Sequence, residues 1–433
     1  MIAPLRQRNF ALLWSGGLIS QIGDWLLSIG LSIYVYVLTG SALATSLALI
    51  VAFVPGVLLG SLAGVFVDRW DRRWTMIISN LLLACGLLPL LAVHNRDSLW
   101  IVYIVLFLES CIEQFVMPAQ KALLPNLVSK EHLVSANSLN SLGANISRLT
   151  GGALGGFLVV LWGLRSVILL DAASFLFVCV MIWLIHMPTQ EQSSSTIEAP
   201  PSIQPSAMPL TSIIAAVKRF GSEWVEGLQL ISQQRVLTIL FIMLAVQSLG
   251  EGVFGVMLIV FVKKVLAGDA LILGSLSSLQ AAGSLVGASF TGLIGNRFSP
   301  GRILGVGIII FGLIDLAIVN VPLLIPGILP VMILFVLVGI PLTSAMIARD
   351  TLLQGSTVDK LRGRIFGTFS TVQALLMMIG MLLAGTLGDR LGPILLLNIQ
   401  GSVYTLSGLL ALFTLGGVII TKQVQQRSGE RTA

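Results

Sequence analysis

The chain has 433 residues and a net charge of +6, with 56% of its residues apolar and only 10% charged. Soluble domains carry about 25% charged residues, so this composition argues against a soluble enzyme and favours an integral membrane protein. The positive charge does not indicate a nucleic-acid partner, because the lysines and arginines lie between apolar runs, as they do at the cytoplasmic ends of membrane helices.

Runs of apolar residues bounded by charged residues, proline or glycine predict twelve membrane-spanning helices, each near the ~20 residues that a bilayer requires. The first six are expected at residues 11–38, 44–66, 74–93, 98–118, 139–160 and 166–186. The second six are expected at residues 236–261, 271–294, 303–320, 327–347, 365–387 and 394–420. We therefore expect an all-α membrane protein with two pseudo-symmetric six-helix bundles, at residues 1–186 and 236–421.

Residues 187–212 differ sharply in composition from both sets of helices. Prolines and serines dominate this segment, which cannot bury enough apolar surface to offset the entropy of ordering it, so we expect a flexible linker. Between Ile213 and Ile231, apolar residues follow at helical spacing, with charged residues on the other faces. This pattern predicts an amphipathic helix on the inner membrane surface, within a cytoplasmic linker at residues 187–235.

Lysine and arginine residues are distributed unevenly between alternate loops. Most of them fall in the segments that are cytoplasmic when both termini are inside, including a tail at residues 422–433. The positive-inside rule therefore predicts a multi-pass protein of the cell membrane with both termini in the cytoplasm.

An internal repeat relates the two sets of helices. Gly23-Asp24 of the first helix matches Gly250-Glu251 of the seventh at an offset of 227 residues. Further matches at this offset, or one residue more, are Gly56 and Gly60 with Gly283 and Gly287, and Gly64, Asp68 and Arg69 with Gly292, Asn296 and Arg297. Repeats of this kind build transporters that hold the substrate between their halves near the middle of the membrane.

Glycines at helical spacing predict close contacts between helices. Gly56, Gly60 and Gly64 lie on one face of the second helix, where a neighbouring backbone can approach. The fifth helix repeats the pattern with Gly151, Gly152, Gly155 and Gly156. In a protein that moves between two states, such faces can also serve as sliding surfaces.

Five charged side chains fall inside predicted helices, where insertion scales put the cost of a central charge at ~2.5–3.5 kcal/mol. They are Asp24, Glu109, Glu113, Arg148 and Glu251. Each needs a partner of opposite charge, a proton or water. Glu109 and Glu113 lie one turn apart on one helix face, and we expect Arg148 to pair with Glu109, either as part of the mechanism or as a static structural ion pair.

The acids that this pairing leaves without a cation are Asp24, Glu113 and Glu251. Because apolar surroundings favour the neutral carboxyl group, these residues are candidates for the proton sites of a coupled transporter. Asp171 and Asp315 also fall in predicted helices, and we interpret them as capping or interface residues.

The loop after the second helix runs from Gly64 to Arg73 and contains Asp68, Arg69 and Arg72. It resembles the signature G-x-x-x-D-[RK]-x-G-[RK]-[RK] of the major facilitator superfamily. The six-plus-six plan and the linker extend the resemblance to the whole chain, which implies the major facilitator fold.

The resemblance also implies roles for residues at the inner ends of the two halves. In the superfamily, the loop aspartate anchors these ends in the outward-facing state, which here places Asp68 near the start of the eleventh helix, close to Arg362 and Arg364. A carboxylate is favoured at a helix N-terminus, which makes this contact physically reasonable. The loop departs from the signature at Asp71, where the superfamily has glycine.

Further residues resemble the branch that includes enterobactin exporters and macrolide efflux proteins. They are Gln21-x-Gly23-Asp24, Pro118-Ala119, Leu123-Leu124-Pro125 and Arg362-Gly363-Arg364. The segment from Ser147 to Gly156 is similar to the antiporter motif G-x-x-x-G-P-x-x-G-G, but Ser147 replaces its first glycine and Gly152 its proline. These features imply export without identifying the substrate, and the missing proline weakens the case for antiport.

These observations predict a secondary active transporter that exports small amphipathic molecules, of a drug, macrolide or siderophore type, by proton antiport and alternating access. We expect a monomer in the lipid bilayer that uses a small-molecule substrate and a proton gradient, with no nucleic-acid partner. Coupling to sodium instead of protons fits the same sequence. The same features also fit an uptake carrier, a flippase for a lipid-like substrate and, in another class, a non-transporting membrane receptor.

An enzymatic function has no support in the sequence, which lacks an H-E-x-x-H pair, a G-x-S-x-G elbow and a Walker-type G-x-x-x-x-G-K-[ST] loop. The three cysteines, Cys85, Cys111 and Cys179, lie in apolar runs without metal-binding spacing. We therefore expect no cofactor and no metal site. Without a nucleotide site, pumping has to depend on an ion gradient.

Overall fold

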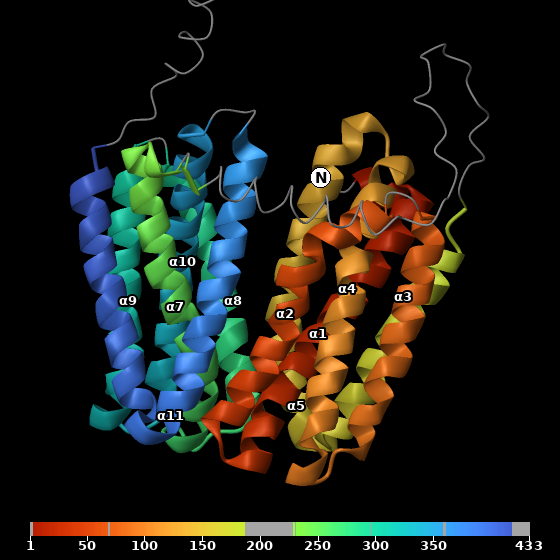
Figure 1. The fold of residues 1–433 in the computed structure, drawn as a ribbon, viewed down its shortest axis with the longest axis horizontal. Coiled ribbons are helices and arrows are strands. Elements are labelled where there is room, and N and C mark those ends of the chain that lie inside the picture. The colour runs from red at the N-terminus through yellow and green to blue at the C-terminus, as the bar shows by residue number, and fades with distance from the viewer. Residues whose placement is uncertain are drawn as a thin grey trace, which may run out of the picture.

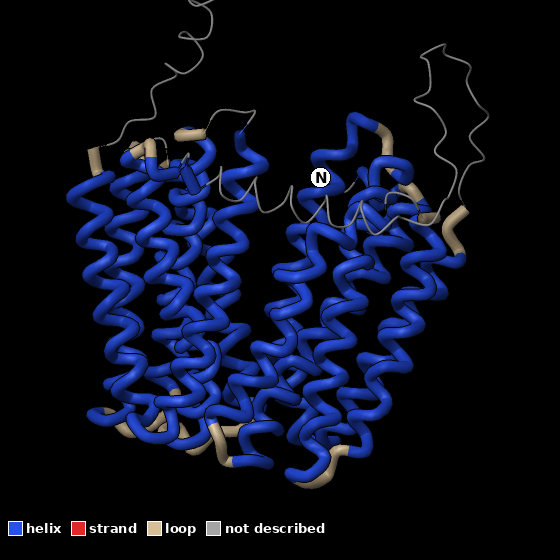
Figure 2. The backbone as a smooth tube through the Cα atoms, in the orientation of Figure 1, coloured by secondary structure: helices blue, strands red, loops and turns tan. Residues whose placement is uncertain are grey.

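The computed structural model describes residues 3–67, 70–186, 228–229, 231–295, 297–357 and 361–417. Within these ranges the chain is helical, with short turns between the helices and no strand (Figures 1 and 2). Several predicted features lie outside the described residues: Asp68 and Arg69, the predicted linker with its amphipathic stretch up to residue 227, and the predicted tail at residues 422–433.

The described helices follow the chain in two groups. The N-terminal half holds α1 (Arg8–Thr39), α2 (Ala42–Val67), α3 (Arg72–Leu87), α4 (Leu99–Leu127) and α5 (Leu133–Trp183). The C-terminal half holds α7 (Arg235–Lys264), α8 (Ala270–Ile294), α9 (Pro300–Leu324), α10 (Leu329–Gly355) and α11 (Arg362–Leu415). Short 3₁₀ turns occur in the N-terminal half at Ala3–Arg6, Leu88–Ala92, Arg96–Ser98 and Lys130–His132.

Ten helices in the described part of the chain are long and apolar enough to cross a membrane, and two of them are too long for one crossing. Helix α5 has 51 residues and α11 has 54, which corresponds to about 75–80 Å for a straight helix, against about 30 Å of hydrocarbon. Each is divided by a glycine with left-handed backbone, Gly163 at φ 74° and Gly392 at φ 77°. The described residues therefore contain the twelve predicted spans, and the predicted fold class is confirmed.

Contacts with α1 show that the two segments of α5 lie side by side. The indole of Trp14 donates a hydrogen bond of 3.0 Å to the carbonyl of Leu139, in the first segment. Met181, in the second segment, packs beside Gly16, half a turn further along α1. Since both ends of α5 return to the same end of α1, the chain reverses direction at Gly163. Glycine adopts this conformation without the steric penalty of a Cβ.

The main error in the predicted helix boundaries concerns α4, which continues to Leu127 instead of ending at residue 118. Pro118 and Pro125 both lie inside it, so Lys121 is on a helix and not in a loop. Ala119 and Leu123 are fully buried in the core of the N-terminal half. This packing favours a continued helix beyond the proline, as membrane helices often allow.

The two halves lie on either side of the molecule, and α2 with α11 and α5 with α8 form the main contacts between them. Figure 1 shows the helices of the two halves converging at the end opposite the N-terminus and diverging toward the end where the N-terminus lies. The molecule therefore presents one end at which its halves meet and one at which they part.

The glycines of α5 allow two of these close approaches. They are Gly151, Gly152, Gly155 and Gly156, and all four are buried. A Cβ at Gly155 would lie 2.8 Å from the Cα of Leu26 in α1, and one at Gly152 would lie 3.1 Å from the carbonyl oxygen of Gly274 in α8. Gly151 and Gly155 thus fit α5 against its own half, while Gly152 and Gly156 fit it against the other half.

Candidate functional site

A cavity of about 210 Å³ lies between α1, α2 and α4 in the N-terminal half. Asp24 of α1 and Glu109 and Glu113 of α4 line it, with the hydroxyl-bearing residues Ser28, Ser32, Thr45 and Ser110. The described residues that line it include no lysine, arginine or histidine. Drug-sized ligands occupy sites of about 300–1,000 Å³, so this space suits water, a cation or one polar group of a larger ligand.

The three carboxyl groups form a compact cluster near the middle of their helices. One oxygen from each lies within 4.8 Å of the others, and all three side chains are partly buried. Glu109 and Glu113 reach it together because residues four apart share a helix face. The Oδ1 atom of Asp24 is buried and has no hydrogen-bond partner among the described residues. Three like charges at this range, without a basic neighbour, require protons or a bound cation to neutralise them.

A fourth carboxyl group, that of Asp171, lies near this cluster and is fully buried. Its Oδ1 accepts a hydrogen bond of 3.2 Å from the Ser174 hydroxyl, and its Oδ2 has no partner among the described residues. The side chain occupies the space that a Cβ at Gly23 would need, next to Asp24 in sequence, and it interacts electrostatically with Asp24. The prediction of a capping or interface role missed this proximity. The position of Asp171 inside a predicted membrane helix was the sequence signal that could have placed it with the other acids.

Arg148 does not pair with Glu109, so this prediction is wrong. Its Nη2 donates a hydrogen bond of 3.0 Å to Oε1 of Gln280 in α8, and its guanidinium lies 5.7 Å from the centre of the Trp25 ring. The physical reason is its position on α5: Arg148 precedes Gly152 by four residues and shares the face that packs against α8, away from α4. Arg148 therefore links the two halves and does not neutralise the acidic cluster.

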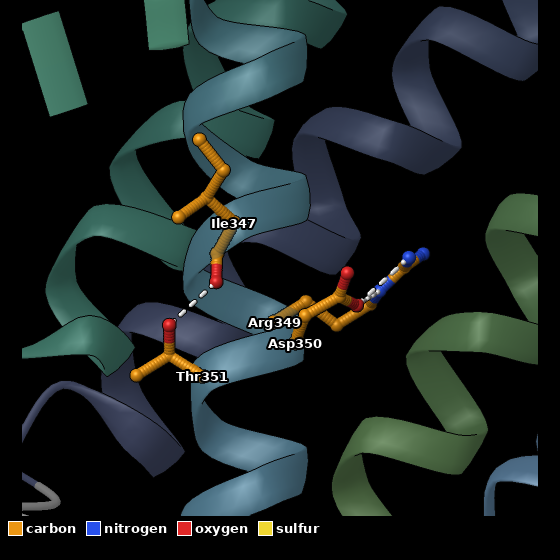
Figure 3. A network of polar contacts seen from close by, with 4 residues as sticks. All are labelled: Ile347, Arg349, Asp350 and Thr351. Atoms are coloured by element: carbon orange, nitrogen blue, oxygen red, sulfur yellow. Dashed lines mark hydrogen bonds and ion pairs between the residues drawn. The ribbon is translucent and has the colours of Figure 1, made fainter. Parts of the chain in front are cut away.

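Glu251 occupies the middle of α7 and does not line the cavity. Glu251 is solvent-accessible. Its carboxyl group interacts with the side chains of Arg349, Gln373 and Arg148. Arg349 also forms an ion pair of 3.1 Å with Asp350 and lies 5.3 Å from the centre of the Phe369 ring. Figure 3 shows this ion pair on α10, with the Thr351 hydroxyl donating to the carbonyl of Ile347 one turn earlier. Glu251 thus has cationic neighbours that the cluster around Asp24 lacks.

The repeated glycines of α2 and α8 have different neighbours in the two halves. Among the described residues, positions for a Cβ at Gly56 and Gly60 have the Gln114 side chain nearby, at 3.7 and 3.6 Å, and no backbone atom of another helix. A Cβ at Gly287 would lie 2.8 Å from the Cα of Ile340, and Gly283 contacts the α10 backbone as closely. The predicted close backbone approach is therefore wrong for Gly56 and Gly60, because a glutamine side chain separates α2 from α4 there. The surroundings of Gly64 lie outside the described residues.

The loop residues that the structure describes bind within the N-terminal half. Asp71, which departs from the superfamily signature, caps α3 by accepting a 2.8 Å hydrogen bond from the Trp74 amide. Arg72 donates to the carbonyl of Ala122 at 3.0 Å, and Arg73 donates to the last carbonyls of α5, including that of Ile182 at 3.2 Å. The contacts of Asp71 and Arg73 complete helix ends, whose first amides and final carbonyls lack partners within the helix, and that of Arg72 ties α3 to α4.

The remaining members of the predicted gating set are only partly described. Asp68 and Arg69 lie outside the described residues, as does the side chain of Arg362, while Arg364 lies in the first turn of α11. The predicted contact between Asp68 and the start of α11 therefore stays a prediction.

Comparison with protein families gives a match over residues 1–416 to the family described as transmembrane secretion effector. Macrolide efflux protein A of Streptococcus pyogenes is 25% identical, over 89% of this chain and 90% of that protein. Enterobactin exporter EntS of Citrobacter koseri is 23% identical, over 92% of this chain and 89% of that protein.

Solved structures share the fold. A bacterial homologue of the iron transporter ferroportin, in an inward-facing state, matches with a TM-score of 0.70 at 16% identity, over 94% of this chain and 98% of that one. A transporter of the POT family in complex with a conjugated peptide matches with a TM-score of 0.70 at 13% identity, over 96% of this chain and 97% of that one.

Proposed function

Because the chain belongs to the transmembrane secretion effector family of major facilitator transporters, and is a transporter and not an enzyme, we propose that it exports small amphipathic molecules by proton antiport and alternating access. The efflux activities named for macrolide efflux protein A and enterobactin exporter EntS support the direction of transport. The observation that carries proton coupling is the cavity, which is lined by three carboxyl groups and, among the described residues, by no basic side chain.

The transport cycle uses the two halves as rigid bundles, residues 1–186 and 236–421, joined by the cytoplasmic linker at residues 187–235. With both termini in the cytoplasm, the end at which the halves diverge faces the cytoplasm, and the described conformation is inward-facing. Rocking of the bundles would bring the inner ends together. In that outward-facing state Asp68 would meet the N-terminus of α11, where a carboxylate is favoured.

Coupling follows from the charge of the acidic cluster. In the inward-facing state, a substrate cation and protons compete for Asp24, Glu109 and Glu113, because each can neutralise the same carboxylates. Substrate binding from the cytoplasm releases protons there, and protons from outside displace the substrate after the bundles rock. The gradient thus drives export, since each full cycle exchanges external protons for an internal substrate.

The charge of the cluster also narrows the substrate class. A cavity lined by carboxyl groups favours an amphipathic molecule with a positively charged amine over an anionic one. Its size fits the amine alone, so the remainder of the substrate has to lie outside this cavity. Catecholate siderophores, which are anionic, are therefore the weaker candidates of the predicted types.

Reconstitution into liposomes with an imposed pH gradient tests this function. Lipophilic cations, macrolides and catecholate siderophores are offered in parallel, and we expect uptake of a cationic compound into inside-acidic vesicles that collapses with a protonophore. Transport of the compound that does not depend on the proton gradient but depends on a sodium gradient would contradict proton coupling. Ligand binding without movement across the bilayer would instead favour a receptor, and transport of lipid alone would favour a flippase.

A further inference from the structure

We propose that Asp389 is a gating residue that holds the two halves together at the end opposite the N-terminus. Asp389 lies near the end of the first segment of α11, before the reversal at Gly392. Its carboxylate reaches across to the N-terminus of α2 in the other half. The proposal rests on alternating access, the mechanism of the proposed function.

Three hydrogen bonds connect Asp389 to α2. The backbone amide of Ala42, the first residue of α2, donates to both carboxylate oxygens, at 3.1 and 3.2 Å. The Ser41 hydroxyl donates to Oδ2 at 3.3 Å. The first amides of a helix have no partner inside it, and its N-terminus carries a partial positive charge, so both effects favour a carboxylate there. Asp389 thus acts as the N-cap of a helix that belongs to the opposite bundle.

The packing of α11 places this carboxylate at the end of α2. Gly385, Gly388 and Asp389 share one helix face. A Cβ at Gly385 would overlap the Ser46 side chain, and one at Gly388 would lie 3.2 Å from the Cβ of Ala42. The two glycines therefore allow α11 to lie directly against α2, which brings Asp389 within hydrogen-bonding distance of the Ala42 amide.

The equivalent crossing of α5 with α8 shows that a cap from the other half is not needed for a helix of this fold. The N-terminus of α8 is capped by its own preceding residue, Asp269, whose Oδ1 accepts from the amides of Leu271 and Ile272 at 3.0 and 3.3 Å. Asp269 and Asp389 therefore perform the same chemistry at the same end of the molecule. Of these two aspartates, Asp389 alone forms its capping bonds across the halves, so opening of this end breaks the bonds of Asp389 and leaves those of Asp269 intact.

We call the hydrogen bonds of Asp389 to Ser41 and Ala42 the latch. The surroundings of these residues allow the latch to be released. Asp389 is exposed, so water can replace the Ala42 amide as its partner without leaving a buried charge. The Ser41 oxygen already accepts a hydrogen bond of 3.4 Å from the Ala44 amide, so α2 keeps a cap of its own when Asp389 leaves. Opening of this end therefore breaks these three hydrogen bonds, and water has to replace Asp389 as the partner of the Ala42 amide.

Distance measurement between spin labels tests the latch without any substrate. The labels are placed at Asp97→Cys and Ile325→Cys, two exposed positions near this end in the two halves, in a protein with Cys85, Cys111 and Cys179 replaced by serine. Loss of a helix-capping carboxylate shifts an equilibrium about fivefold. We expect Asp389→Ala to raise the ratio of long to short distances about fivefold, and Asp389→Asn, which keeps one acceptor oxygen, to raise it less.

The matched control is Asp269→Ala, which removes a helix cap within one half and leaves the distance ratio as in the parent. An unchanged ratio in both Asp389 variants would overturn the proposal, as would an equal shift in Asp269→Ala, which would indicate general destabilisation. Because the readout needs neither substrate nor a proton gradient, a failure of the proposed export function leaves this test intact. If every variant including the parent shows one fixed distance, the halves do not exchange between states, and alternating access itself is refuted.

Discussion

Asp24 and Glu251 occupy equivalent positions of the repeat, yet their electrostatic surroundings are opposite. Asp24 lies among Glu109, Glu113 and Asp171, and in the part of the chain that the structure describes no basic side chain lines its cavity. Glu251 has Arg148 and Arg349 as neighbours instead. An acid surrounded by acids has to exchange protons or cations, whereas an acid beside arginines already has its counter-charges. A carboxyl group at the same point of the fold is thus suited to coupling in one half and to a stable charge network in the other.

The packing of the two halves differs at the same place. In the C-terminal half, Gly283 and Gly287 bring α8 against the backbone of α10. In the N-terminal half, Gln114 separates Gly56 and Gly60 from α4, and the acid-lined cavity lies between these helices and α1. At this place the N-terminal half therefore holds a cavity between its helices, whereas in the C-terminal half the backbones of α8 and α10 are in contact.

Substitution of the equivalent acids is the strongest way to break this comparison. We expect Asp24→Asn or Glu113→Gln to reduce proton-driven efflux to background, because the neutral side chains cannot exchange protons. Glu251→Gln should retain measurable gradient-driven efflux. The measurement is transport in liposomes, with membrane insertion checked for each variant. Wild-type rates in Asp24→Asn and Glu113→Gln would reject the coupling site, and complete loss in Glu251→Gln alone would reverse the assignment of the two halves.

Substitution of the equivalent glycines tests the packing difference. A Cβ at Gly283 overlaps the carbonyl of Val336, so Gly283→Ala should destabilise the protein by about 1–3 kcal/mol through overpacking. Gly60→Ala meets only the Gln114 side chain at 3.6 Å and should be neutral or stabilising by up to ~1 kcal/mol, because alanine is the better helix former. Thermal unfolding of the purified protein compares them. Equal losses of stability would show that α2 and α4 pack as closely as α8 and α10.

The loops after α2 and α8 differ by a charge, since Asp68 corresponds to Asn296 in the repeat. Asp68→Asn makes the two loops alike at this position. We expect slower turnover with retained substrate binding, because the outward-facing state loses its proposed anchor at α11. Binding and transport are measured on the same preparation, and unaltered turnover would remove the gating role.

The smallest effect is expected at Asp350. Its side chain is 47% exposed, and surface ion pairs contribute ~0–1 kcal/mol, so Asp350→Asn should destabilise the protein by no more than about 1 kcal/mol. Its thermal unfolding would be compared with that of Arg349→Gln, which removes the same ion pair and also the arginine beside Glu251, and we expect the larger loss of stability there. Equal losses in the two variants would show that Glu251 does not depend on Arg349 as its counter-charge, which weakens the contrast with Asp24.

The sequence was sufficient for the number of spans, because each needs an apolar run of bilayer length and the runs are separated by clear interruptions. It also identified the three acids of the cavity, because charges in such runs are rare. It could not predict which way Arg148 faces, since rotation about a helix axis depends on the neighbouring helix, here α8 through Gly152 and Gly156. The continuation of α4 beyond Pro118 likewise depends on burial of Ala119 and Leu123 in the folded core.

The sequence did not reveal the contacts of two acids, Asp171 and Asp389, for related reasons. Asp171 becomes part of the acidic group only because Gly23 leaves room for it beside Asp24, a contact between segments far apart in the chain. Asp389 caps α2 across the interface between the halves, and no local pattern records such a contact. Spacing along a helix thus predicted which residues share a face, and the tertiary structure was needed to show what each face meets.

Substrate-induced proton release from the purified protein tests most directly whether the cluster in the N-terminal half is the coupling site. The cationic substrate identified in liposomes is added to protein in weakly buffered detergent solution with a pH indicator. We expect acidification with the wild-type protein and with Glu251→Gln, and none with the double variant Asp24→Asn/Glu113→Gln that still binds the substrate. Undiminished proton release from that double variant would contradict the assignment of coupling to these carboxyl groups.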